Sequence, residues 1–311
     1  MSILLNSGIR DELYFQTQVT LHQFISIGEK IRRGDVVNEI LNNNFFKSKI
    51  QLHHNPDLKI VGQYLKNSWN TENVLNLNKL ILENTNNSFI VQWGIPQTYY
   101  SIFTSLLSFY KSMGYPQESH TSVLRRYGDL VQEGKFPESM SMYLTGTKKD
   151  KTFVNIEKPK GLRTLEFNIR NEESIDNKIC QLLNSTREFK LSESGKDYKK
   201  NSKTKVKKLN ETQLREVSKN VGNTTILDFL YRKRIKSNYQ DTDTFTSELL
   251  DGKTIIDELC HMVYNYNLVT ESYIYKRIGK KGFQGIIDSQ LKLNGEQVFS
   301  NRIEIIKSLN S

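Results

Sequence analysis

The sequence has few of the residues that build disulfide frameworks, metal centres and membrane spans. Only two of its 311 residues are cysteines, Cys180 and Cys260, and they stand far apart without partners at zinc-ligand spacing. No run approaches the ~18 consecutive apolar residues of a membrane span. The first residues, Met-Ser-Ile-Leu-Leu-Asn, lack the basic and apolar regions of a signal peptide. We therefore expect a globular, cytoplasmic protein with no membrane partner.

Metal and cofactor motifs are also missing. His53 and His54 are adjacent, so their side chains point apart on a helix or a strand, and no third ligand stands at a suitable spacing. The glycine-rich segment 279–285 has neither the glycine spacing nor the Lys-Ser/Thr ending of a phosphate-binding loop. The sequence predicts no cofactor and no metal site.

Positive charge is concentrated in one segment. The formal net charge is +10, and residues 196–208 hold seven lysines and one aspartate, which is +6. Such a block attracts phosphate backbones without reading sequence. It is also typical of a solvated, mobile loop, and it contains a single aromatic residue, Tyr198. Both interpretations stay open. The lysines are Lys196, Lys199, Lys200, Lys203, Lys205, Lys207 and Lys208.

Hydrophobic periodicity predicts a mainly α fold, a helical bundle with a small β-hairpin insertion. We expect an N-terminal helical region over 1–85 and a bundle over 86–311. A strongly apolar helix from Ile95 to Met113 is followed, after about five residues, by a second helix that ends at Gly134. Because the connection is short, the two helices are predicted to be antiparallel neighbours.

The middle of the chain changes its pattern. Apolar and polar residues alternate around a Pro-Lys-Gly turn, so residues 150–172 are predicted to form the β-hairpin. The segment from Glu172 to Leu183 again has helical periodicity. Periodicity is then lost, and we expect a lysine-rich loop over 187–219.

Residues 224–239 are predicted to form a helix with polar groups on its inward face. Wound as a helix, the apolar residues form one arc, and Arg234 and Asn238 fall in its middle. An unpaired buried guanidinium is costly, so Arg234 needs a carboxylate, carbonyl groups, a partner subunit or a phosphate beside it. Arg234 is therefore either part of a functional site or a structural residue at a helix or dimer interface.

Two groups of motifs occur in a defined order. The first is a double tyrosine in a helix, a glycine that ends this helix and a histidine that opens the next; the second is an arginine followed by Asn-Tyr. These residues are Tyr99, Tyr100, Gly114, His120, Arg234, Asn238 and Tyr239. Over 86–134 and 224–270 the chain thus resembles HEPN-domain proteins, which are α-helical bundles. The resemblance implies a role in a bacterial defence or toxin–antitoxin system.

The resemblance also shows a departure. Active HEPN ribonucleases pair the arginine with a histidine after four to six intervening residues, whereas this chain has Tyr239, Gln240 and Asp241 there. Metal-independent RNA cleavage needs a base for the 2′-hydroxyl and a cation near the phosphate. Arg234 can supply the cation. His120 or Tyr239 would have to serve as the acid or base.

Three functions follow as hypotheses. The first is a HEPN-like protein that binds nucleic acid, RNA above all, through the lysine-rich loop. The second is a divergent metal-independent endoribonuclease with Arg234, Asn238, Tyr239 and His120 in its active site. The third is a scaffold that binds only protein. We expect a homodimer and a protein partner from the same operon. Nucleic-acid contacts are assigned to the seven lysines and to Arg232, Lys233 and Lys236.

Overall fold

The computed structural model describes residues 7–48, 55–84, 89–116, 119–157, 171–201, 208–239, 244–245, 251–290 and 297–310. Within these ranges the chain is mainly helical, with one small sheet, as predicted. The elements are α1 (Ser7–Arg33), α2 (Val36–Asn42), α3 (Asn44–Lys47), α4 (Leu58–Asn84), α5 (Phe89–Ser112), α6 (His120–Gln132), η1 (Glu138–Met140), β1 (Tyr143–Thr145), β2 (Thr152–Val154), α7 (Glu172–Asn201), α8 (Glu211–Val221), β3 (Thr224–Thr225), α9 (Ile226–Tyr239), α11 (Gly252–Gln290) and α12 (Gln297–Leu309).

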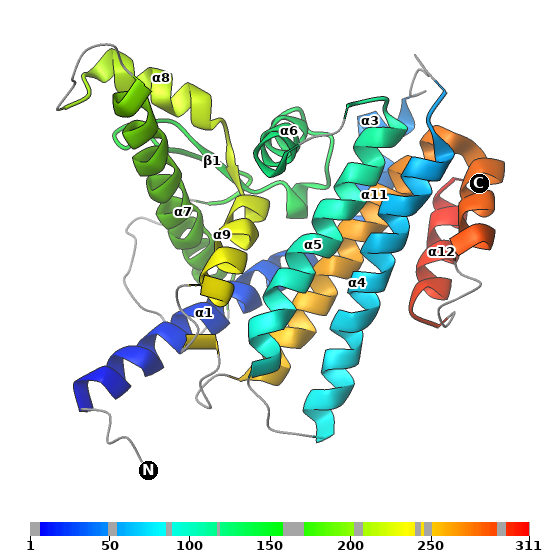
Figure 1. The fold of residues 1–311 in the computed structure, drawn as a ribbon, viewed down its shortest axis with the longest axis horizontal. Coiled ribbons are helices and arrows are strands. Elements are labelled where there is room, and N and C mark those ends of the chain that lie inside the picture. The colour runs from blue at the N-terminus through cyan, green and yellow to red at the C-terminus, as the bar shows by residue number, and fades with distance from the viewer. Residues whose placement is uncertain are drawn as a thin grey trace.

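Three long helices, α4, α5 and α11, lie side by side and form the centre of the molecule (Figure 1). The helix α5 is apolar on most of its circumference, which suits a position between two partners. The helix α4 precedes residue 85, yet its residues Val61, Leu65 and Leu75 belong to the same apolar core as those of α5. The expected boundary at residue 85 therefore does not separate two cores.

The remaining helices flank this centre. The helix α9 packs against α5, and α1 packs against both α11 and α7 (Figure 1). The helices α7 and α8 form a pair beside α9, and α12 lies on α11. None of the helices in the described ranges has the length and apolarity needed to cross a bilayer.

The sheet is small and antiparallel, with the order β2-β1-β3. Tyr143 in the central strand lies opposite Val154 on one side and Thr225 on the other. The strand β2 falls inside the predicted hairpin of 150–172, and its partner in the sheet is β1, which precedes it. The second half of the predicted hairpin, 158–170, lies outside the described residues.

The prediction of a lysine-rich loop over 187–219 is wrong for most of that range. The helix α7 continues to Asn201, and α8 begins after Asn210, whose side chain forms a reciprocal capping box with Gln213. The extension of α7 buries Arg187, Leu191 and Gly195, one residue in each successive turn. Two of these three are not hydrophobic, so apolar periodicity could not reveal the buried face. Residues 202–207 lie outside the described residues.

The predicted pair of helices is present, but its antiparallel packing is wrong. Figure 1 shows α6 end on while α5 lies in the plane of the view, so the two helices cross steeply. The buried face of α6 also packs elsewhere: the hydroxyl of Tyr127 lies 3.3 Å from the hydroxyl of Tyr266 in α11 and 3.3 Å from the carbonyl of Met140, which share its one proton. The first half of α6 stays in contact with α5, where His120 stacks on Phe103 and Arg126 lies over the ring of Tyr110.

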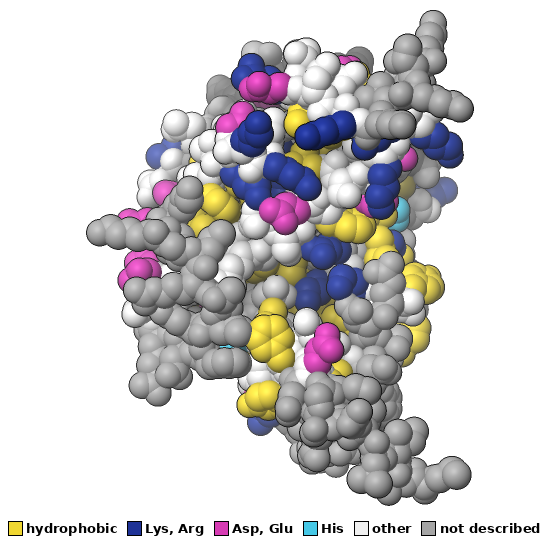
Figure 2. Space-filling view, turned by 90° about the vertical axis from the view of Figure 1, so that its left-hand side faces the viewer, with side chains coloured by type: hydrophobic (Ala, Val, Ile, Leu, Met, Phe, Trp, Pro, Cys, Tyr) yellow, Lys and Arg dark blue, Asp and Glu magenta, His cyan; other side chains and the backbone are white. Residues whose placement is uncertain are grey.

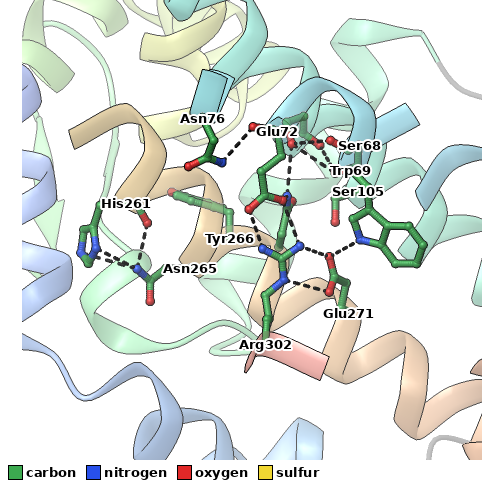
Figure 3. Close-up of polar contacts among 12 residues, drawn as sticks. Ser68, Trp69, Glu72, Asn76, Ser105, His261, Asn265, Tyr266, Glu271 and Arg302 are labelled. Atoms are coloured by element: carbon green, nitrogen blue, oxygen red, sulfur yellow. Dashed lines mark hydrogen bonds and ion pairs between the residues drawn. The ribbon is translucent and has the colours of Figure 1, made fainter. Parts of the chain in front are cut away.

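A buried charge network anchors α12 (Figure 3). Arg302 binds both carboxylate oxygens of Glu72 in α4, at 2.5 and 2.9 Å, and both of Glu271 in α11, at 2.9 and 3.0 Å. Trp69 and Asn267 donate further hydrogen bonds to these carboxylates. All three charged side chains are fully buried. Burial lowers the pKa of Arg302, but the two carboxylates outweigh it, so the guanidinium stays charged.

Candidate functional site

The helix α9 forms where the sequence predicts it, and its first turn is firmly held. Ile226, Leu227 and Leu230 are buried against the core. The carboxylate of Asp228 accepts a hydrogen bond from the backbone of Thr225 at 2.8 Å and pairs with Lys190 of α7 at 2.6 Å. This fixed start determines where the second half of the helix points its polar side chains.

Arg234 lies among three tyrosine rings. Its guanidinium carbon is 4.8 Å from the ring centroid of Tyr231, 5.3 Å from that of Tyr100 and 5.4 Å from that of Tyr99. One terminal nitrogen donates a hydrogen bond to the Tyr100 hydroxyl at 2.5 Å. Cation–π contacts of this kind hold a guanidinium in a partly desolvated place without neutralising its charge.

The charge of Arg234 has no counterion among the described residues. Its Nε is buried without a hydrogen-bond partner. The two fully buried arginines among the described residues differ: Arg302 binds two carboxylates, and Arg187 donates five hydrogen bonds to carbonyl and hydroxyl oxygens. These two arginines are saturated, whereas the Nε of Arg234, like that of Arg232, has no hydrogen-bond partner in the described part of the chain.

His120 belongs to the same cluster. It opens α6 directly after the N-cap Ser119. Its ring stacks on Phe103 with centroids 4.3 Å apart, and its Nδ1 lies 2.9 Å from the Tyr99 hydroxyl, with which it hydrogen-bonds. Its centroid is also 5.8 Å from that of Tyr231. His120 and Arg234 thus touch the same tyrosine rings although they are far apart in sequence.

The surroundings favour a neutral imidazole. Burial lowers the pKa of His120 below 6.5, and the positive charge of Arg234 lowers it further. Burial also raises the pKa of Tyr99 well above its usual range, so this phenol keeps its proton. At neutral pH the cluster therefore holds the guanidinium of Arg234 beside a neutral imidazole and the protonated phenol of Tyr99. We call Arg234, His120, Tyr99, Tyr100 and Tyr231 the Arg234 cluster.

The elements that form the Arg234 cluster carry few carboxylates. The helix α5 contains no aspartate or glutamate, and the first turn of α6 has none. In α9 the single acidic residue, Asp228, is paired with Lys190. This composition leaves the local potential positive, which suits an anionic ligand.

The other predicted residues of α9 have different surroundings. Asn238 is half-buried, and its Oδ1 has no hydrogen-bond partner. Tyr239 is 79 % exposed. Arg232 binds the hydroxyl of Ser185 in α7, and Lys233 binds the hydroxyl of Thr20 in α1. Lys236 is half-buried. Arg232 and Lys233 are therefore tied to neighbouring helices and do not join the cluster.

The lysine block is not beside the Arg234 cluster. Arg232 donates a hydrogen bond to Ser185, and Asp228, one turn earlier in α9, accepts one from Lys190, which lies later in α7. The two helices therefore run in opposite directions. Lys200 is fifteen residues beyond Ser185, about 22 Å along α7 and away from Arg234. Lys196 pairs with Glu193, and Lys196, Lys199, Lys200 and Lys208 are exposed. Lys203, Lys205 and Lys207 lie outside the described residues.

The face that carries α7 and α8 is basic in its upper half. Figure 2 shows lysine and arginine side chains gathered there, with a few acidic side chains among them. Exposed residues of this region include Lys196, Lys200, Arg215 and Lys219. The chain thus has a broad basic face and, separately, the small Arg234 cluster.

Some cluster residues were not predicted as site residues from the sequence. In the sequence, Tyr231 belongs to the apolar arc of its helix and Tyr99 to the apolar face of the preceding bundle helix, as does Phe103, which stacks on His120 beside the cluster. The double tyrosine was visible as a motif, but its contact with Arg234 depends on how α9 crosses α5. No sequence signal predicts that crossing.

Two other features do not coincide with the Arg234 cluster. A surface cavity of about 360 Å³ lies between α6, the β1–β2 turn and α8, and it is lined by Arg125, Asp129, Arg215 and Lys219 among others. It contains none of the predicted catalytic residues. In the described ranges, no three His, Cys, Asp or Glu side chains are grouped so that they could hold a metal ion.

Comparison with models of known protein families, with curated proteins and with solved structures finds no match for this chain. The resemblance to HEPN-domain proteins therefore stays a hypothesis.

Proposed function

We propose that the protein binds RNA and that Arg234 contacts the phosphate backbone. The observation that carries this proposal is the guanidinium itself, half-buried among tyrosine rings, with an unused buried Nε and no counterion in the described part of the chain. Guanidinium groups bind phosphate oxygens through paired N–H donors. A phosphate beside the terminal nitrogens would balance the charge of the guanidinium, for which the described residues supply no carboxylate.

The basic face formed by α7 and α8 supports the same function. A segment with a charge of +6 attracts nucleic acid over long distances and without sequence preference. Its separation from the Arg234 cluster gives the two regions different roles. The lysines increase the local concentration of RNA, and the Arg234 cluster makes the defined contact.

The test compares the RNA affinity of the parent protein with that of Arg234→Ala, by fluorescence polarisation of a labelled RNA. Loss of one charge-assisted phosphate contact costs about 1.5–3 kcal/mol, which is roughly a tenfold to hundredfold rise in Kd. The matched control is Arg33→Ala, which removes an exposed arginine at the last residue of α1, outside both the basic face and the Arg234 cluster. Equal affinities of the two variants would refute a role for Arg234 in binding.

His120 favours a second candidate function, metal-independent cleavage of RNA. An imidazole that is neutral at pH 7 can accept a proton from a 2′-hydroxyl. Its Nδ1 is engaged with Tyr99, so when Nδ1 carries the proton, Nε2 is left as the base. The 2′-oxygen would then attack the phosphorus and form a 2′,3′-cyclic phosphate, while the bond to the 5′-oxygen breaks and this oxygen takes a proton from water. Arg234 would stabilise the charge on the phosphate.

This second function has its own test. Purified protein is incubated with labelled RNA in the presence of a chelator, and the products are examined for 2′,3′-cyclic phosphate and 5′-hydroxyl ends. His120→Ala and Arg234→Ala should abolish cleavage, and Tyr99→Phe should reduce it by removing the group that orients His120. If the parent cleaves none of a panel of RNAs, the cluster is a binding site without catalysis.

A further inference from the structure

Two exposed aromatic residues lie near the Arg234 cluster and have no partner in the described part of the chain. Trp93 in α5 is 57 % exposed and Tyr239 at the end of α9 is 79 % exposed. Among the described residues neither makes a side-chain hydrogen bond, a ring contact or a cation–π contact. Large aromatic side chains left in water call for a functional explanation when they adjoin a site.

The position of Trp93 follows from helix geometry. Trp93 and Tyr100 are seven residues apart, which is close to two turns, so both project from the same face of α5 about 10 Å apart. Tyr100 is itself 39 % exposed and binds Arg234 through its hydroxyl. The exposed face of α5 thus leads from Trp93 directly to the guanidinium.

The position of Tyr239 follows from how α9 crosses α5. Arg234 meets Tyr100, and three residues later the carbonyl of Ser237 accepts a hydrogen bond from Gln92 at 3.1 Å. The end of α9 therefore runs toward the start of α5. Tyr239 lies two residues beyond Ser237, at the end of the molecule where Trp93 also lies.

We propose that Trp93 and Tyr239 stack on bases of an unpaired RNA strand whose phosphate is held by Arg234, so that the site selects unpaired over double-helical RNA. This inference rests on the proposed RNA binding. Every base offers a π-face, and binding sites for single strands combine cationic and aromatic side chains in this way. Bases within a helix are stacked on one another and cannot offer their faces.

A protein partner is the competing occupant. The neighbouring helix α4 exposes the aliphatic residues Val74 and Leu77, which would suit a second copy of the chain. The absence of carboxylates from α5 and from the second half of α9, with an uncompensated guanidinium between the aromatic residues, favours a polyanion. Self-association is accordingly measured in the same experiment.

The chain contains two tryptophans, which makes a direct experiment possible. Trp69 is buried, so fluorescence that an added quencher can reach comes from Trp93. Titration of the full-length protein with an unpaired 12-nucleotide RNA should quench this fluorescence, and the same RNA in a duplex should not. Trp93→Ala and Tyr239→Ala should each raise Kd for the unpaired RNA by about fivefold to a hundredfold, whereas Trp93→Phe should retain most of the affinity.

The control is Tyr14→Ala, which removes an exposed ring from α1, and light scattering reports the oligomeric state of each variant. Tight binding of unpaired RNA that Trp93→Ala and Tyr239→Ala leave unchanged would overturn the stacking proposal while RNA binding stands. Equal affinity for duplex would also overturn it. Loss of self-association in Trp93→Ala with unaltered RNA affinity would identify a protein interface. If the parent protein binds no RNA, both the proposed RNA binding and the proposed base stacking are refuted.

Discussion

Replacing Arg302 with alanine should be among the most damaging single changes in this chain. Its side chain makes four hydrogen bonds to Glu72 and Glu271, all between fully buried groups. Removing the cation leaves two buried carboxylates without compensation. Breaking one buried ion pair costs about 3–5 kcal/mol, and total stabilities are about 5–15 kcal/mol, so the variant should lose a large part of its free energy of unfolding.

The loss should depend on pH in a defined direction. Burial raises the pKa of Glu271 above 4.5 even with Arg302 present. A carboxyl whose pKa is raised in the folded state takes up a proton on folding. The stability that it contributes therefore falls as pH rises from its pKa in the unfolded state through its pKa in the folded state. Without Arg302 the pKa rises further. The free energy of unfolding of Arg302→Ala should therefore differ less from that of the parent at pH 5 than at pH 8.

The assay is urea unfolding followed by circular dichroism at both pH values. The control is Arg215→Ala, which breaks an ion pair with Glu211 that is exposed on both sides and should change the stability by less than about 1 kcal/mol. A second variant, Arg302→Met combined with Glu72→Gln and Glu271→Gln, removes all three charges and should recover much of the loss. A loss of less than about 1 kcal/mol for Arg302→Ala at pH 8 would refute the reasoning.

Three further predictions concern the site, the sheet and the basic face. An NMR titration should give His120 a pKa below 6.5, and Arg234→Gln should raise this pKa because a nearby positive charge is removed. An unchanged pKa would show that the charge of Arg234 does not act on His120. Gly146→Ala should lower the free energy of unfolding by about 1–3 kcal/mol, since φ is +93° and the new Cβ would collide with the Asp150 carbonyl. Gly285→Ala should not lower it, because the new Cβ on this helix would meet no atom within 4 Å. Replacing the seven lysines of 196–208 with glutamine should weaken RNA binding and flatten its salt dependence, and equal binding at low and high salt would contradict this.

The sequence predicted the helical class and α9 because both depend on local periodicity. The apolar arc of Ile226, Leu227 and Leu230 is buried as a 3.6-residue pattern requires. The second half of α7 was predicted as a loop because its buried face contains Arg187 and Gly195. Arg187 is buried through hydrogen bonds to carbonyls of the β1 turn and of Gly222, which are distant in sequence.

Long-range packing explains the other differences. A short connection predicted antiparallel packing of α5 and α6, but the hydrogen bonds of Tyr127 direct α6 toward α11. The charge network of Arg302 joins α12 to α4, and these two helices are more than 200 residues apart in the chain. No local sequence pattern predicts such a contact. His120 could be named from the sequence as a possible partner of Arg234, but only the crossing of α9 over α5 brings both to Tyr99.

The salt dependence of RNA binding by Arg234→Ala tests the central claim most directly. Each phosphate contact on a single strand adds about 0.7 to the slope of log K against log salt concentration. If Arg234 holds one phosphate, the variant should bind more weakly and its slope should be smaller by about 0.7, while Arg33→Ala leaves the slope unchanged. A slope for Arg234→Ala equal to that of the parent would contradict the account.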